Sequence, residues 1–252
     1  MIHFVGAGPG APDLITVRGQ RLVRQADVIV YAGSLVNEEI LKEAKAGCAI
    51  YNSASMTLEE VLEVLLKAER TGRSAVRLHT GDPCLYGAIR EQMDALEREG
   101  IEYDYTPGVS SFCAAAAALE AEYTLPGVSQ TVIITRLAGR TPVPQAENLE
   151  SLASHRASMV VFLSVKETGE VCRQLIEGGY PPDTPAAIVY KASWPQEKTV
   201  RGTLDTLPAL AAQEGIEKTA LITVGGFLGG EYERSKLYDP SFSHGCRQAQ
   251  KD

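Results

Sequence analysis

Hydrophobic and polar residues follow two different periods along this chain. Between Leu58 and Leu66 the apolar positions recur at i, i+3, i+4, i+7 and i+8, which is the stripe of an amphipathic helix. Thr57 suits the N-cap of this helix, and Glu60, three residues later, completes a capping box. Short continuous apolar runs, such as Met1 to Val5, instead predict buried strands.

Strand and helix patterns alternate through the first half of the chain. Strands are expected at 1–5, 27–31, 49–51, 74–79 and 102–105. Helices are expected from Thr16 and at 57–70, 86–99 and 114–118, with a weaker helical pattern at 35–45. This alternation predicts a mostly parallel sheet with helices on both faces.

The alternation of strand and helix patterns is interrupted near 124–127, and this segment is typical of a linker. Further strands are expected at 131–136, 158–164, 185–190, 198–202 and 219–224, and helices near 148–155, 168–178 and 203–213. The short loop around Trp194 and Pro195 suits a hairpin, so this second sheet should be mixed. The sequence therefore predicts two α/β domains, at 1–120 and 128–230, and a polar tail at 231–252.

Three loops of the first half directly follow predicted strands. The first loop (6–13) is rich in glycine and proline, the second (80–83) reads Thr-Gly-Asp-Pro, and the third (106–111) reads Thr-Pro-Gly-Val-Ser-Ser. Because the carboxyl ends of parallel strands share one edge, these loops are expected to line one ligand site.

The first loop also fits the spacing of a dinucleotide-binding fingerprint, with Gly6, Gly8 and Ala11 in place. Two features oppose that interpretation. Prolines delay the next helix until Thr16, so no helix N-terminus faces a pyrophosphate, and Asp27 begins a strand where the fingerprint needs an acid at the strand's end. A nucleotide-binding oxidoreductase stays as the alternative from another class.

Composition narrows the field of functions. The formal net charge of -8 disfavours a nucleic-acid binder, and an anionic ligand must therefore meet a local basic cluster. The five cysteines are scattered without zinc spacing and the four histidines lie far apart, so no metal site is expected. The cysteines are expected to be reduced thiols in a cytoplasmic protein. No apolar run approaches the roughly 20 residues of a membrane span, and no export signal is expected.

Several stretches stand in a characteristic order: GAGPGAPDLIT, ADVIVYAGSLV, HTGDPCLYG, TPGVSSFCAAAA and YKASWPQEK. Taken together they resemble the tetrapyrrole (corrin and porphyrin) methyltransferase family, from residue 2 to about residue 228. Within that family, the segments AGSLV, GRTPVP and SWP are most similar to members that methylate a corrin precursor. Another ring position, as in uroporphyrinogen III methylation, is the near alternative.

The resemblance implies two α/β domains with S-adenosylmethionine bound in the cleft between them, a tetrapyrrole substrate and a homodimer. Residue by residue, the family's cofactor-binding positions carry over to Pro9, Gly81, Asp82, Pro83, Tyr86, Ser110, Ser111, Leu163, Ala192 and Leu221. Methyl transfer from a sulfonium mainly needs donor and acceptor held in line, which agrees with the lack of other catalytic motifs. No general base is identified.

Two arginines are candidates for holding the substrate. Corrin precursors carry several carboxylates, and Arg136 and Arg140 flank a short loop after a predicted strand. The planar fork of arginine suits a carboxylate, so both are predicted to bind the macrocycle. The alternative is a pair of solvated surface arginines.

Overall fold

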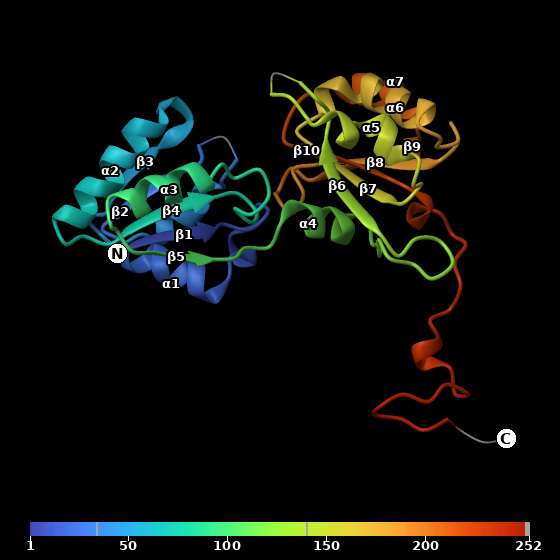
Figure 1. Cartoon of the computed structure of the whole chain (residues 1–252), viewed down its shortest axis with the longest axis horizontal. Helices are drawn as coiled ribbons and strands as arrows, with labels where there is room; N and C mark the ends of the chain where they lie inside the picture. Colours follow the sequence, from blue (N-terminus) through green and yellow to red (C-terminus); the bar gives the residue numbers. More distant parts are fainter. Residues whose placement is uncertain (34, 140, 250–252) are drawn as a thin grey trace. The chain divides into compact units, whose positions relative to one another are not determined.

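The computed structural model describes residues 1–33, 35–139 and 141–249 of the chain (Figure 1). Its contacts divide the chain into two compact units. The first unit comprises Met1–Ala118 and Lys191–Lys198, and the second comprises Leu119–Tyr190 and Thr199–Asp252. Each unit contains one five-stranded sheet, and each is described by itself below.

The sheet of the first unit has the strand order β3-β2-β4-β1-β5, and all its neighbouring strands run parallel. The strands are β1 (Ile2–Gly6), β2 (Val28–Tyr31), β3 (Ala49–Asn52), β4 (Ala75–His79) and β5 (Tyr103–Thr106). The predicted parallel sheet is therefore confirmed, with β4 and β1 beside each other near its centre.

Helices cover both faces of this sheet, as predicted. One face packs against α1 (Val17–Gln25), and the other packs against α2 (Leu58–Arg70) and α3 (Arg90–Arg98). A fourth helix, α4 (Ser111–Ala118), follows β5 in the chain. Alternate residues of β1 enter different clusters: Val5 packs with Val23 of α1, and Phe4 packs with Leu65 of α2. Because side chains alternate across a strand, each face buries its own set of apolar residues.

The capping box predicted at Thr57 is confirmed, and Thr16 caps α1. The hydroxyl of Thr16 accepts a hydrogen bond from the backbone N–H of Gly19 at 3.1 Å. Thr57 and Glu60 form both hydrogen bonds of the capping box at the start of α2. These bonds satisfy backbone donors that the first turn of a helix leaves without intrahelical partners.

Three predicted helix boundaries in the first unit are wrong. The helix expected at 86–99 begins only at Arg90, because Tyr86 and Ala88 take left-handed conformations with φ of 58° and 49°. The helix expected at 114–118 begins earlier, at Ser111, and the weaker pattern at 35–45 forms the 3-10 helix Glu38–Glu43.

The sheet of the second unit has the order β6-β7-β10-β8-β9 and is mixed, as predicted. Strands β6 and β7 pair in parallel, whereas β10 pairs antiparallel with both β7 and β8. The strands are β6 (Val132–Arg136), β7 (Ser158–Phe162), β8 (Pro185–Tyr190), β9 (Lys198–Thr203) and β10 (Ala220–Val224). The helices are α5 (Leu149–Ala153), α6 (Thr168–Glu177) and α7 (Leu207–Glu214), and one apolar cluster joins them to the sheet.

Short 3-10 helices occur in both units, at Pro12–Leu14, Ser53–Ser55, Gln145–Glu147, Val165–Glu167, Gly226–Leu228 and Lys236–Tyr238. None of the described helices is both long and apolar enough to cross a membrane. The segment Lys191–Lys198, here called the 191–198 segment, connects β8 with β9, but its contacts group it with the first unit.

Candidate cofactor site

The three loops predicted to share one edge of the first sheet do meet there. Gly6 ends β1, Gly81 follows β4 and Gly108 follows β5, and we call these three residues the glycine junction. A Cβ atom added to Gly108 would lie 2.1 Å from the carbonyl oxygen of Gly81 and 2.8 Å from the Cα atom of Gly6. Real Cβ atoms do not approach backbone so closely, so the junction requires glycine at this position.

Backbone hydrogen bonds fasten the first loop to the second. The N–H of Ala7 donates to the carbonyl of His79 at 2.7 Å. Gly8 and Gly81 then exchange two bonds, of 3.2 Å and 2.8 Å. Both glycines have positive φ, 79° at Gly8 and 57° at Gly81, a region that side chains disfavour. The first two loops therefore form one connected piece of backbone.

Asp82 fastens the second loop to the third. Its Oδ2 accepts a hydrogen bond from the backbone N–H of Gly108 at 2.9 Å, and its Oδ1 accepts one from the N–H of Cys84 at 2.9 Å. The hydroxyl of Tyr105, in β5, also donates to Oδ1. Both carboxylate oxygens are thus directed into the protein.

These bonds determine the charge state of Asp82. Burial by itself raises the pKa of this carboxyl, but the hydrogen bonds from Tyr105, Cys84 and Gly108 together outweigh it and hold the pKa below its ordinary value. Burial and the Asp82 carboxylate raise the pKa of Tyr105, which remains a protonated donor. A carboxylate with a lowered pKa and three donors is poorly suited to accept a proton as a general base.

A buried histidine supports the junction from within the sheet. His79 is the last residue of β4, and its ring stacks on Phe4 with centroids 6.3 Å apart. Burial, with a further contribution from the Arg77 cation, lowers the pKa of His79 to about 3. Within the described part of the chain its Nε2 atom has no hydrogen-bond partner. His79 is therefore a neutral core residue.

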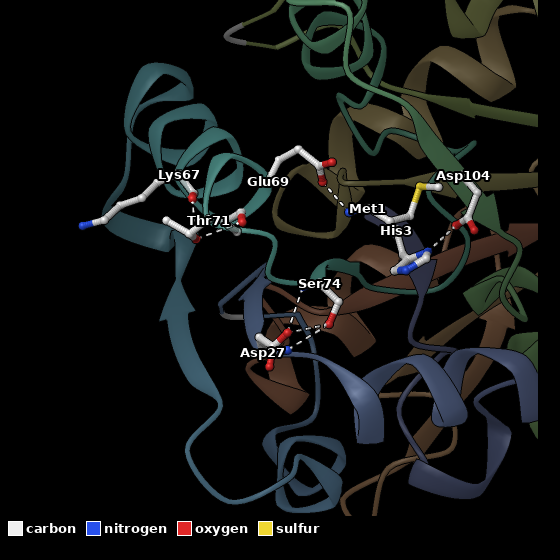
Figure 2. Close-up of polar contacts among 9 residues, drawn as sticks. Met1, His3, Asp27, Lys67, Glu69, Thr71, Ser74 and Asp104 are labelled. Carbon is white, nitrogen blue, oxygen red and sulfur yellow. Dashed lines mark hydrogen bonds and ion pairs between the residues drawn. The ribbon is translucent and has the colours of Figure 1, made fainter.

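Asp27, the candidate for the acidic residue of a dinucleotide-binding fingerprint, has other partners in the structure. Figure 2 shows Asp27, which precedes β2, bonded to Ser74, which precedes β4. The Oδ2 of Asp27 accepts from the Ser74 N–H at 2.9 Å, and its Oδ1 pairs with Lys45 at 2.7 Å. This carboxylate lies at the amino edge of the sheet, whereas the glycine junction lies at the carboxyl edge. The geometry opposes a ribose-binding role for Asp27.

Most of the predicted cofactor-binding residues lie in the first unit. Those on or beside the three loops are Pro9, Gly81, Asp82, Pro83, Ser110 and Ser111. Tyr86 lies in the exposed turn before α3, and Ala192 is buried in the 191–198 segment. Contacts with a cofactor stay a prediction for all of them.

The other two predicted cofactor-binding residues belong to the second unit. Leu163 directly follows β7; its side chain is 65% exposed and its φ is 55°. An exposed leucine in a left-handed conformation is unusual, and such strain concentrates at functional positions. Leu221 is instead buried within β10, where its side chain packs in the protein.

The first of the two predicted substrate arginines is held by its own loop. The guanidinium of Arg136 donates to the carbonyls of Leu137, Thr141 and Pro142 at 3.3, 3.1 and 2.8 Å. These bonds use three of its five N–H donors. Arg140 lies outside the described residues.

Sequence reasoning missed three side chains that donate hydrogen bonds to these loops. Tyr105 donates to Asp82, Asn37 donates to the carbonyl of Gly10, and Trp194 donates to the carbonyl of Pro9. Each comes from a different part of the chain than the loop it holds, so no local pattern links the pair. Only the SWP stretch of the family resemblance pointed toward one of them.

A family model described as Tetrapyrrole (Corrin/Porphyrin) Methylases matches residues 1–208. This chain belongs to that family of methylases, as its loops at the carboxyl edge of the first sheet had indicated.

Individual relatives are similar over nearly the whole chain. A cobalt-precorrin-4 C(11)-methyltransferase of Methanocaldococcus jannaschii is 54% identical, covering 99% of this chain and 97% of that protein. The X-ray structure of the cobalt precorrin-4 methyltransferase CbiF aligns with a TM-score of 0.89 and 48% identity, covering 91% of this chain and 96% of that one. A uroporphyrin-III C-methyl transferase from Thermus thermophilus, complexed with S-adenosyl homocysteine, aligns with a TM-score of 0.75 at 28% identity, covering 90% and 98%.

Proposed function

We propose that this chain transfers a methyl group from S-adenosylmethionine to C11 of precorrin-4 or of its cobalt complex, in cobalamin biosynthesis. The observation that carries this proposal is the 54% identity, over 99% of the chain, to a relative named for methylation at C11. Methylation at another ring position, as in the more distant uroporphyrin methyltransferase at 28% identity, is less well supported.

The glycine junction and its three loops are the proposed site for the cofactor. The loops at 6–13, 80–83 and 106–111 contain no lysine or arginine, and Asp13 and Asp82 add negative charge. Loops that lack cations and carry carboxylates suit a cationic ligand better than a pyrophosphate. A structural neighbour that holds S-adenosyl homocysteine supports the same choice. When bound, S-adenosylmethionine supplies a methyl group on a positively charged sulfonium.

The role of the protein in this reaction is alignment. Glycines at the junction let the three loop backbones approach one another closely, and the bonds of Asp82 keep the second and third loops in one arrangement. Holding the methyl donor and the acceptor carbon in line converts a bimolecular reaction into an effectively unimolecular step. The engaged oxygens and lowered pKa of Asp82 remove it as a proton acceptor, so its proposed role is positioning.

Substrate binding is proposed for Arg136 and Arg140. The substrate's carboxylates need cations, because the chain itself carries a net charge of -8. Three bonds to carbonyls keep the Arg136 guanidinium at one place in the 137–142 loop. We propose that this loop, ordered by Arg136, presents positive charge to the macrocycle.

The proposed setting is the cytoplasm, with the enzyme as a homodimer. All five cysteines lie in the described residues and are free thiols, which supports a reducing compartment. Light scattering after size-exclusion chromatography tests the dimer: a mass near 54 kDa, about twice the chain's 27.1 kDa, is expected.

Product analysis tests the function. The purified protein receives S-adenosylmethionine labelled with 13C in its methyl group, together with precorrin-4, cobalt-precorrin-4 or uroporphyrinogen III in separate reactions. A labelled methyl at C11, located by NMR, is expected with at least one substrate. A methyl at C2 of uroporphyrinogen III, with no product from either precorrin-4 form, would contradict the proposal.

A further inference from the structure

The first loop is held by side chains that lie far away in the sequence. The indole Nε1 of Trp194 donates to the carbonyl of Pro9 at 3.0 Å. The backbone N–H of Ala11 donates to the hydroxyl of Ser193 at 3.0 Å. Both side chains belong to the 191–198 segment, whose contacts place it in the first unit with this loop.

The residue between these two bonds is held as well. The side-chain amide of Asn37 donates to the carbonyl of Gly10 at 2.9 Å in a buried position. Successive residues of the loop, 9 to 11, therefore each have a backbone polar group bonded to a distant side chain. Pro9 and Pro12 have no N–H to offer. The shape of this loop thus depends on side chains that reach it from elsewhere.

The indole of Trp194 also lies directly against the loop backbone. A Cβ atom added to Gly10 would be 2.0 Å from Cδ1 and 2.1 Å from Nε1 of the ring. The contact is possible only because residue 10 is glycine, which has no Cβ atom. Gly10 and Trp194 are therefore matched in shape.

The 191–198 segment is a compact turn that presents these groups. The N–H of Trp194 donates to the carbonyl of Lys191, and the N–H of Glu197 donates to the carbonyl of Trp194, both at 2.9 Å. Lys191 and Ser193 take left-handed conformations, with φ of 46° and 68°. Non-glycine residues keep such conformations only where their surroundings hold them, and functional sites are where they concentrate.

We propose that Trp194 and Ser193 are positioning residues for the cofactor: they fix the backbone of residues 9–11 in the form that binds S-adenosylmethionine. This inference rests on the proposed function, which assigns the first loop to the cofactor. The chain contains one tryptophan, so its fluorescence reports on the surroundings of Trp194.

The test compares variants of the full-length protein for binding of S-adenosylhomocysteine by calorimetry, well below each melting temperature. Trp194→Phe keeps a ring against Gly10 but loses the bond to Pro9, and Ser193→Ala loses the bond from Ala11. Each should weaken binding about 2- to 10-fold, the range for one neutral hydrogen bond. Trp194→Ala loses ring and bond together and should weaken binding about 10-fold or more.

Gln196→Ala is the matched control, because Gln196 lies in the same segment and its side chain is bonded to Lys191. It should bind like wild type. A residue with only a structural role would lower the melting temperature and leave the affinity of the folded protein unchanged. In wild type and Gln196→Ala, the Trp194 emission should change when S-adenosylhomocysteine binds.

Wild-type affinity in Trp194→Phe, Trp194→Ala and Ser193→Ala would overturn the inference and leave the proposed function intact. Equal weakening in Gln196→Ala would overturn it as well, because the effect would then come from the segment and not from these contacts. Absence of S-adenosylhomocysteine binding in wild type would instead refute the proposed function, and this inference with it.

Discussion

Two loops of this protein, one in each unit, are each held by a single charged side chain. Asp82 follows β4 in the first unit and accepts three hydrogen bonds, and Arg136 ends β6 in the second unit and donates three. The bonds of Asp82 come partly from Tyr105 and Gly108, on another strand and its loop. The bonds of Arg136 all go to the loop that follows it.

The difference shows how far each loop depends on its neighbours. Asp82 couples the second loop to the third, and Gly81 beside it is bonded to the first loop through Gly8. A change near Asp82 should therefore disturb three loops together. A change at Arg136 should disturb only residues 137–142. A coupled set of loops is suited to hold one ligand in one geometry. A loop whose bonds are all its own is suited to vary in conformation and sequence.

The largest expected effect comes from filling the glycine junction. Gly108→Ala places a Cβ atom 2.1 Å from the carbonyl oxygen of Gly81, and backbone on both sides cannot yield easily. We expect a loss of about 3 kcal/mol in the free energy of unfolding, measured by urea denaturation.

Gly139→Ala is the matched change in the Arg136 loop. A Cβ atom there would meet no described atom within 4 Å, so the free energy of unfolding should change by less than about 0.5 kcal/mol. Similar losses in the two variants would break the comparison between a coupled and a self-contained loop.

Removing the Asp82 carboxylate should have the next largest effect. Asp82→Ala leaves the Gly108 N–H and the Tyr105 hydroxyl without their acceptor, which should cost about 2 kcal/mol of stability. Disorder of the second and third loops should weaken S-adenosylhomocysteine binding about 10-fold or more, measured by calorimetry. Asp82→Asn keeps one oxygen acceptor and should fall between Asp82→Ala and wild type. Unchanged affinity in Asp82→Ala would separate this loop from the cofactor.

Arg136 variants should affect the other ligand. Arg136→Ala should raise the KM for the macrocycle about 10- to 100-fold, the equivalent of one charge-assisted bond, and leave S-adenosylhomocysteine affinity unchanged. Arg136→Lys keeps the charge but cannot span the three carbonyls, so it should resemble Arg136→Ala if loop order matters. Full activity in Arg136→Lys would show that charge alone suffices, and equal weakening of both ligands in Arg136→Ala would remove the substrate assignment.

The last expected effect appears only on acidification and concerns the stability of the first unit. Burial holds the pKa of His79 near 3 in the folded chain, below the 6.5 of an unperturbed histidine. The unfolded chain therefore gains a proton as the pH falls below about 6.5 while the folded chain does not, so stability declines with falling pH.

His79→Leu removes this titration. Between about pH 6 and pH 4, wild type should lose up to about 1.4 kcal/mol per pH unit more than the variant, measured by urea denaturation at each pH. Parallel pH profiles would show that His79 takes up its proton in the folded state too.

The architecture was largely predictable because it rests on local periodicity. The apolar stripe of α2 predicted a helix that packs on a sheet, and the apolar run of β1 predicted a buried strand of that sheet. The order of strands and helices then predicted that three loops lie at one edge of the sheet. Helix starts were less predictable: nothing local shows that Tyr86 and Ala88 adopt positive φ, since neither is glycine.

The contacts that shape the candidate site were not predictable. Glycine content located the loops, but Trp194 and Pro9 are 185 residues apart, and Asp82 and Tyr105 are 23 apart. Such pairs depend on how the finished sheet brings strand ends together. The same applies to Arg136: its residue type suggested a carboxylate ligand, and the structure shows backbone carbonyls as its partners.

Hydrogen exchange of the whole protein, measured by mass spectrometry with and without ligand, tests the central claim that the coupled loops of the first unit hold the cofactor. S-adenosylhomocysteine should slow exchange at residues 6–13, 80–83, 106–111 and 191–198 together, because these segments are bonded to one another, and should leave 137–142 unchanged. NADH should protect none of them. Protection of these loops by NADH, or binding of S-adenosylhomocysteine that leaves all of them unprotected, would contradict the account.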